Sequence, residues 1–217
     1  MYGEEKMKVD VIIVKYNTPE LEEICIQSVV DNTEIPYRLT IFDNYQTKHN
    51  IGQLWNKLIS ESSSDYICLL NSDTKVTPKW LSKLLKTFDR VDKVGCVGPS
   101  TDNSHNQQSR EKPEEVFVDF GKTYPKWCIG GFCLVFPKKV WEEVGGFPED
   151  FGFYGQEVAL VDRIMSIGYK QIWRTDVFVH HEGSASVKKA EKSGEMSETL
   201  ERQLGKENCD RFRFNKI

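Results

Sequence analysis

The 217-residue sequence has no long uncharged apolar run. Its strongest apolar runs, residues 11–14 and 132–136, are far shorter than the ~20 residues that a transmembrane helix needs. The acidic start at Glu4 and Glu5, followed by a short apolar stretch, does not fit a secretory signal. We therefore expect a cytoplasmic protein. Such a protein could still contact the inner face of the membrane.

Other absences narrow the function. The six cysteines form no CxxC pair, so neither a disulfide scaffold nor a cysteine metal site is indicated. No GxGxxG or GxxxxGK motif occurs, which excludes dinucleotide-binding and P-loop proteins. A nucleotidylyltransferase needs a glycine-rich loop after the first strand, where this sequence has Lys15-Tyr16-Asn17. The net charge of −4 argues against a nucleic-acid partner.

The residues that are present predict an α/β protein. Short β-branched runs alternate with segments of helical periodicity, which is typical of a mostly parallel sheet covered on both faces. We expect strands at 9–14, 39–42, 66–70, 94–97, 132–136 and 172–179, and helices at 18–30, 50–59, 78–88, 137–144 and 158–167. Between residues 98 and 126 the pattern fails, apart from a short candidate strand at 116–118. A further helix is expected at 197–211.

Polar residues follow several of the predicted strands. In open α/β sheets, ligands bind at the carboxyl ends of the strands, so these residues are candidates for a site. Taken singly, each is better explained as a helix cap or a turn. Together they place carboxylates, amides and two imidazoles at one edge of the sheet: Lys15-Tyr16-Asn17, Asp43-Asn44, Asn71-Ser72-Asp73 and His180-His181.

This edge could hold a metal ion. Asn71 and Asp73 lie on the same side of an extended segment, where a carboxylate oxygen of Asp73 could bind a hard divalent cation. His180 or His181 could supply another ligand. Adjacent histidines at a strand end are also commonly just solvated, and strand parity alone does not choose between them.

The ordered motifs resemble those of the family 2 glycosyltransferases, which have the GT-A fold. The resemblance runs from about residue 8 to residue 186 and rests on the order of its segments: VIIVKYN at 11–17, Asp43-Asn44, Asn50-Ile51-Gly52 with Asn56, Asn71-Ser72-Asp73, Gly130-Gly131-Phe132, residues 145–147 and 154–157, and Val179-His180-His181. It implies a GT-A domain over 1–186, with a Rossmann-like sheet and a small acceptor-side extension. Residues 187–217 would form a helical tail beside it.

The resemblance also implies site residues. Those framing the nucleotide would be Val14, Tyr16, Asn17, Asp43, Asn44, Asn50, Gly52 and Asn56. Asn71-Ser72-Asp73 stands where the family has an Asp-x-Asp metal motif, so Asp73, with His180 or His181, would hold Mn2+ or Mg2+. Since the first acid is missing, Asn71 and Ser72 would contact ribose or phosphate.

Two further positions carry alternatives. Gly131 could leave room for the donor sugar, or it could serve only as a turn residue. Glu157 would be the general base that takes the proton of the acceptor hydroxyl, as the second member of the family's acid pair, whose first position is Gln156 here. A glutamate near a helix N-terminus can instead merely satisfy backbone amides.

The implied function is a metal-dependent inverting glycosyltransferase. Its donor would be a nucleotide-diphosphate sugar, with a UDP sugar favoured, and its acceptor a hydroxyl of a glycan, a lipid-linked glycan or a protein. The substitutions at Asn71 and Gln156 keep open a degenerate relative that binds such ligands without turnover. Residues 206–216, basic and aromatic, would form a packed helix or contact an anionic membrane surface.

Overall fold

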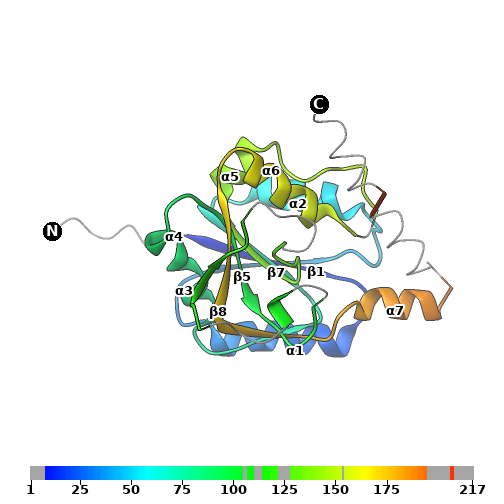
Figure 1. Ribbon diagram of the computed structural model, residues 1–217. Coiled ribbons are helices and arrows are strands. Elements are labelled where there is room, and N and C mark those ends of the chain that lie inside the picture. Colours follow the sequence, from blue (N-terminus) through cyan, green and yellow to red (C-terminus); the bar gives the residue numbers. More distant parts are fainter. Residues whose placement is uncertain are drawn as a thin grey trace.

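The computed structural model describes residues 8–104, 107–109, 114–121, 128–152, 154–194 and 206–207. Strands and helices alternate along most of this chain (Figure 1). The strands are β1 (Val9–Lys15), β2 (Arg38–Asp43), β3 (Tyr66–Asn71), β4 (Thr74–Val76), β5 (Val94–Ser100), β6 (Phe117–Asp119), β7 (Cys133–Pro137) and β8 (Lys170–His181). The helices are α1 (Pro19–Asn32), α2 (Ile51–Glu61), α3 (Trp80–Leu85), α4 (Thr87–Arg90), the 3₁₀ turn η1 (Gln107–Ser109), α5 (Lys138–Glu143), α6 (Gln156–Ser166) and α7 (Ala185–Lys192).

The strands form one mixed sheet in the order β2-β1-β3-β7-β5-β8-β4, with β6 also paired to β8. Strands β1, β2 and β3 are parallel to one another, and β5 is parallel to β8. Strand β7 lies antiparallel between β3 and β5, and β4 and β6 are antiparallel to β8. The expected mostly parallel sheet is therefore confirmed, and its parallel strands end at the same edge.

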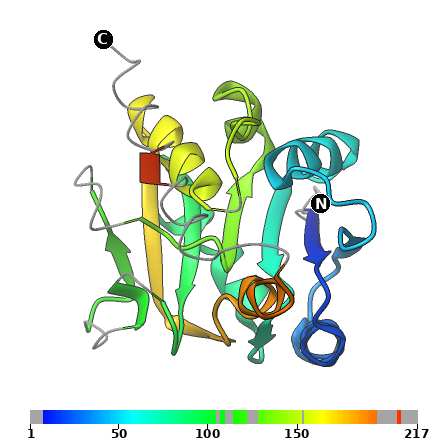
Figure 2. The same cartoon turned by 90° about the vertical axis from the view of Figure 1, so that its right-hand side faces the viewer.

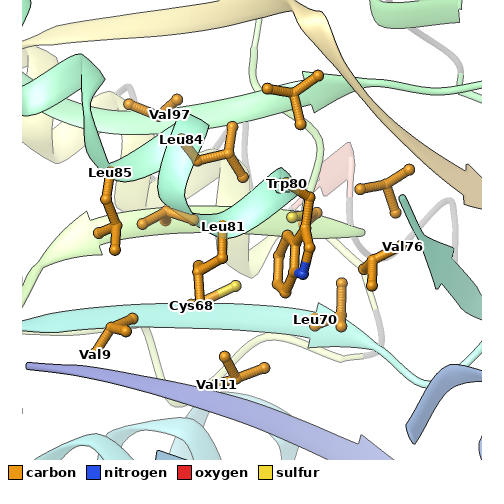
Figure 3. Packing of buried hydrophobic residues seen from close by; sticks show 14 of the residues in the cluster. Val9, Val11, Cys68, Leu70, Val76, Trp80, Leu81, Leu84, Leu85 and Val97 are labelled. Carbon is orange, nitrogen blue, oxygen red and sulfur yellow. The ribbon is translucent and has the colours of Figure 1, made fainter. Parts of the chain in front are cut away.

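Each face of the sheet carries its own hydrophobic core. Along β1, Val9, Val11 and Ile13 pack on the side of α1 and α3, whereas Ile12 packs on the side of α2, α5 and α6. This alternation follows from the period of two in a strand. Figure 3 shows the first core, in which Trp80 of α3 lies over the sheet, and Figures 1 and 2 show the two groups of helices on opposite sides.

Some elements differ from those expected. The helix predicted at 78–88 starts only at Trp80, because Lys79 has a left-handed conformation (φ 64°), and it divides at Lys86 into α3 and α4. Strand β5 continues to Ser100, beyond its predicted end. Strand β4 and helix α7 were not expected, since the one is too short and the other too polar to give a periodic signal. The helix predicted at 197–211 lies outside the described residues.

In the described part of the chain, no helix has the length and apolarity to cross a membrane. Helix α7 is the element that extends furthest from the sheet edge at which β1 ends (Figure 1).

The close packing of α6 on β5 depends on Gly95, and this gives a first prediction. A Cβ atom at Gly95 would lie 2.2 Å from Ile164 Cγ2 and 2.7 Å from Tyr169 Cβ. We expect Gly95→Ala to lower the free energy of unfolding by about 1–3 kcal/mol through overpacking. Denaturant unfolding measures this directly.

The control is a double-mutant cycle with Ile164→Ala, which removes the atom nearest to the new methyl group. The cost of Gly95→Ala should be smaller in the Ile164→Ala background than in the wild type. Equal costs in both backgrounds would show that the contact with Ile164 does not limit packing at this position.

Candidate active site

The candidate site lies at the sheet edge where β1, β2, β3 and β8 end. Figure 2 views the molecule from this side, with α7 in front. The short strand β4 runs antiparallel to β8, with Thr74 opposite His181 and Val76 opposite Val179. Because of this register, the residue just before β4, Asp73, lies beside the last residue of β8. Two segments that are far apart in the sequence thereby meet at one point.

Asp73 and His181 form a buried pair. Their side chains are 7% and 13% exposed, and Asp73 Oδ1 lies 3.3 Å from His181 Nε2. The second oxygen, Asp73 Oδ2, accepts a hydrogen bond from the backbone N–H of Ala185 at the start of α7 (3.2 Å). The amide nitrogen of Asn71 lies 3.5 Å from His181 Nε2. The imidazole stacks on Phe132, with ring centroids 5.1 Å apart and an interplanar angle of 18°.

The pairing controls the charge of both groups. Burial alone would raise the pKa of Asp73, but the hydrogen bond and charge of His181 and the amide of Ala185 outweigh it and lower the pKa. Burial would likewise lower the pKa of His181, but Asp73 and the carbonyl of Asn103 raise it. Each partner favours the charged form of the other, so a buried carboxylate is retained at this edge.

His180, the other histidine considered for the metal site, does not face Asp73. Its Nδ1 lies 2.8 Å from Asp102 Oδ2, its side chain is 52% exposed, and its ring contacts the ring of Phe178 edge-on. Neighbouring residues of a strand point to opposite faces, so only one of the two histidines can meet Asp73. The structure places His181 there.

The donor chemistry at Asp73 and His181 fits a divalent cation. A carboxylate oxygen and an imidazole nitrogen suit Mn2+ well, while Mg2+ has a stronger preference for oxygen alone. Among the described residues, no group of three or more His, Cys, Asp or Glu side chains could hold a metal. A cation held by this pair would therefore need further ligands from water or from a substrate, such as diphosphate oxygens.

Glu157 lies at the start of α6, after Gly155, whose left-handed conformation (φ 97°) lets the chain turn into the helix. Its side chain packs directly against Gly131: a Cβ atom at Gly131 would be 3.0 Å from Glu157 Cγ. The space that Gly131 leaves is thus filled by the side chain of Glu157. Burial raises the pKa of Glu157, and hydrogen bonds with the backbone of Glu157 and Gly155 only partly offset this.

A continuous set of contacts links Glu157 to the Asp73 and His181 pair. Glu157 packs on Gly131, the next residue is Phe132, and Phe132 stacks on His181. A second link runs through Tyr154, whose hydroxyl donates to Ser184 Oγ at the start of α7 (3.3 Å). Glu157 is therefore connected to the pair of Asp73 and His181 through packed residues, Gly131 and Phe132.

The residues after β1 and β2 lie on the adjoining part of the edge. Tyr16 packs edge-on against Tyr45, with ring centroids 5.5 Å apart. Asp43 is exposed and accepts a hydrogen bond from the backbone N–H of Tyr45. Lys15 Nζ lies 3.2 Å from Glu22 Oε2 and 3.7 Å from Asp43 Oδ2. Aromatic and acidic groups are thus presented side by side.

Four other candidates at this end have mainly backbone or packing roles. The side chain of Asn44 holds the turn that follows it, through Thr47 and His49. Asn17 has a left-handed backbone (φ 57°) between β1 and α1. Val14 packs against the core beneath α2, and Ser72 is buried beside Asp73.

The side-chain amides of Asn50 and Asn56, at the start of α2 and within it, hold the loop of residues 147–151. Asn50 Oδ1 caps α2 by accepting from the N–H of Gly52, and its Nδ2 donates to the carbonyl of Phe151. Asn56 makes a matched pair of hydrogen bonds with the backbone of Phe147. A Cβ atom at Gly52 would lie 2.3 Å from the carbonyl oxygen of Pro148. The polar atoms of Asn50 and Asn56 are therefore engaged with residues 147–151, the loop that leads to Glu157.

The site contains residues that the sequence patterns did not single out. Asp102 and Asn103, which follow β5, contact both histidines. The rule that ligands gather after strand ends would have found them, had the end of β5 been placed at Ser100. Gln156, by contrast, was singled out by the sequence as the first position of the family's acid pair. It is fully buried and donates to the carbonyl of Gly152, while its Oε1 has no hydrogen-bond partner among the described residues.

Comparison with known proteins shows a family match and relatives of similar sequence. Residues 45–145 match the family model described as glycosyl transferase family 2. The chain is 22% identical over 225 residues to the O-antigen biosynthesis protein RfbC of Myxococcus xanthus. That alignment covers 82% of this chain but only 18% of the relative, so the chain spans less than a fifth of that protein's length.

Two solved structures share the fold. The mannosyltransferase PcManGT of Pyrobaculum calidifontis, solved in complex with GDP-Man and Mn2+, superposes with a TM-score of 0.60 at 16% identity, over 80% of this chain and 56% of that one. GalNAc-T7, solved with UDP, GalNAc and Mn2+, gives 0.61 at 13% identity, over 83% and 44%. The chain thus has the fold of the GT-A glycosyltransferases, and its match over residues 45–145 confirms the resemblance to glycosyl transferase family 2 that the sequence motifs indicated.

Proposed function

We propose that this chain transfers a sugar from a nucleotide-diphosphate donor to an acceptor hydroxyl with inversion at the anomeric carbon. The observation that supports the proposal most strongly is the contact path from the Asp73 and His181 pair through Phe132 and Gly131 to Glu157. A candidate cation site that is linked in this way to a candidate base would give the separation of tasks that glycosyl transfer needs.

In this proposal Asp73 and His181 would hold a divalent cation, Mn2+ or Mg2+. Such a cation supplies charge stabilisation for the departing diphosphate, typically several kcal/mol. The amide of Asn71, close to His181 Nε2, is placed to donate to a phosphate or ribose oxygen. With a single carboxylate in the pair, we expect metal and nucleotide to bind together much more tightly than the metal alone.

Glu157 takes the proton of the acceptor hydroxyl, while that oxygen bonds to the anomeric carbon and the bond to the diphosphate breaks. A base works best when its pKa is near the operating pH, and burial moves the pKa of Glu157 in that direction. The packing of Glu157 against Gly131 restricts where its carboxylate can lie. The acceptor would approach along the side of Tyr154, from a glycan, a lipid-linked glycan or a protein.

The nucleotide would lie along the ends of β1 and β2. Tyr16 and Tyr45 offer aromatic faces, and Asp43 offers an exposed acceptor for the N–H groups of a base. The two structural neighbours are complexes with different nucleotides, GDP-Man and UDP. A UDP sugar remains our preferred donor, and a cytoplasmic location our preferred setting.

The role of Glu157 gives a prediction for both activity and stability. Glu157→Gln keeps the shape of the side chain but cannot accept the proton, so transfer should fall by about 10²–10⁴-fold. A carboxyl group with a raised pKa destabilises the folded protein once it is ionised, because the folded state binds the proton more tightly than the unfolded state. At neutral pH the Gln variant should therefore melt at a higher temperature than the wild type.

The stability difference should shrink as the pH falls through the pKa of Glu157, because the wild-type side chain is then protonated in the folded state. Thermal melts across this pH range, together with transfer assays, check both effects. Transfer by Glu157→Gln at close to the wild-type rate would remove Glu157 from the mechanism.

The role of Asp73 is tested by ligand-induced stabilisation. A panel of UDP, dTDP, GDP and CMP, each with and without Mn2+, should identify one nucleotide that raises the melting temperature only with the metal. A ligand at 100 times its dissociation constant adds about 2.7 kcal/mol of apparent stability. Asp73→Ala should abolish this gain, whereas Asp92→Ala, which removes an exposed carboxylate elsewhere on the surface, should keep it.

A turnover assay with sugar derivatives of the nucleotide that the panel identifies separates the two functions considered for this chain. Nucleotide binding with slow hydrolysis or transfer of the sugar supports the enzyme. Binding of a nucleotide sugar without any turnover would instead support a binding protein that has lost catalysis. Metal-dependent binding that survives Asp73→Ala would place the cation elsewhere.

A further inference from the structure

We propose that the loop after β5, Asp102 and Asn103, is a positioning device that presents one nitrogen of His181 to Asp73. The inference rests on the proposed function, in which His181 Nε2 is a metal ligand. It adds two residues that contact His181 and that act through it, one by its backbone carbonyl and one by its side chain.

The backbone of Asn103 determines the tautomer of His181. Its Nδ1 lies 3.0 Å from the backbone carbonyl oxygen of Asn103. A carbonyl oxygen can only accept, so this Nδ1 must carry a hydrogen. The neutral ring then has its lone pair on Nε2, the atom that lies 3.3 Å from Asp73 Oδ1. The carbonyl of Asn103 thus selects the form of the ring that can bind a cation beside Asp73.

Asp102 holds the backbone that carries the ring of His181. The N–H of His181 donates to Asp102 Oδ1 (2.9 Å), and the other oxygen of Asp102 lies 2.8 Å from His180 Nδ1. One carboxylate therefore holds both consecutive residues at the end of β8. These hydrogen bonds hold the pKa of Asp102 below its ordinary value against the opposing effect of burial.

Asn103 is itself fixed in place. Its carbonyl can select the tautomer of His181 only under this condition. Asn103 Nδ2 donates to the carbonyl of Glu182 (2.6 Å), directly after His181. The next residue, Gly183, has a left-handed conformation (φ 81°), and a Cβ atom there would lie 2.5 Å from Asn103 Nδ2. The loop and the end of β8 therefore hold each other by hydrogen bonds that run in both directions.

Together with the stack on Phe132, these contacts restrain the ring from its face, its Nδ1 and its backbone, and leave Nε2 toward Asp73. Groups that hold a metal-binding histidine in this way typically change metal affinity by 10–100-fold when they are removed. Asp102 and Asn103 are therefore positioning residues and not ligands.

The test uses the metal-free protein first. Long-range 15N NMR of labelled histidine reports which ring nitrogen carries the hydrogen. It is recorded at a pH where the ring of His181 is neutral and in an Asp73→Ala background, which has no carboxylate to hold a hydrogen on Nε2. We expect the Nδ1–H form when residues 102 and 103 are wild type. Asn103→Ala and Asp102→Ala should give a mixture of both forms. Asp102→Asn, whose amide oxygen can still accept from the N–H of His181, should restore much of the wild-type pattern.

The second measurement is the affinity for Mn2+ in the presence of the nucleotide identified by the melting panel. Asn103→Ala and Asp102→Ala should weaken it by 10–100-fold. Glu182→Ala is the matched control in the same loop, because it keeps the backbone carbonyl that binds Asn103, and it should leave both measurements unchanged.

These measurements distinguish failure of the positioning role from failure of the proposed cation site. A wild-type tautomer ratio in both alanine variants overturns the proposal, whatever the metal does. A shifted ratio in a protein that binds no Mn2+ supports the positioning role and counts against the proposed cation site instead. If Asp102→Ala does not fold, Asn103→Ala and Asp102→Asn still decide the question.

Discussion

The pairing of β4 with β8 is the constraint on which the candidate site depends. Strand β4 has only three residues, yet its register against β8 determines that Asp73 meets His181 and not a neighbour of His181. A shift by one residue would exchange the faces of all side chains in the short strand. This register sets the contact between Asp73 and His181. Around this contact lie the start of α7, the ring of Phe132 and the loop after β5.

The burial of Asp73 explains why so many groups gather there. A buried carboxylate is costly unless it is paired and hydrogen-bonded, and removing one member of such a pair leaves an uncompensated charge. Asp73 has two partners, His181 and the N–H of Ala185 at the N-terminus of α7, where the helix dipole also favours a negative charge. The site thus links the end of the sheet to α7 through a single side chain. A change in the charge of Asp73 would be felt by both elements.

The sequence predicted the sheet and the edge at which the site lies, because buried strands and the residues after them give strong local signals. It did not choose between His180 and His181. Val177 and Val179 are buried on the same face as His181, so the parity of β8 was readable, but which face Asp73 would occupy depends on the pairing with β4. Strand β4 has three residues, which is too few to show a periodic pattern in the sequence. Asn50 and Asn56 show a related limit, since their residue types suited a ligand site while their partners, in the loop at 147–151, depend on tertiary structure.

The two neutral residues of the site make physical sense together with His181. An acid in place of Asn71 would add a negative charge near Asp73 and compete for the same imidazole nitrogen, from which the Asn71 amide is 3.5 Å away. Like charges in one site raise each other's pKa, so one of the two carboxyl groups would tend to hold a proton. With an amide at position 71, the imidazole of His181 does not have to pair with a second carboxylate besides Asp73. Gln156 follows the same logic beside Glu157: it is fully buried, and an acid there would add a second ionisable group next to a carboxyl whose pKa is already raised by burial. Under the proposed function, neutral amides at both positions would leave one carboxylate for the cation and one for the proton.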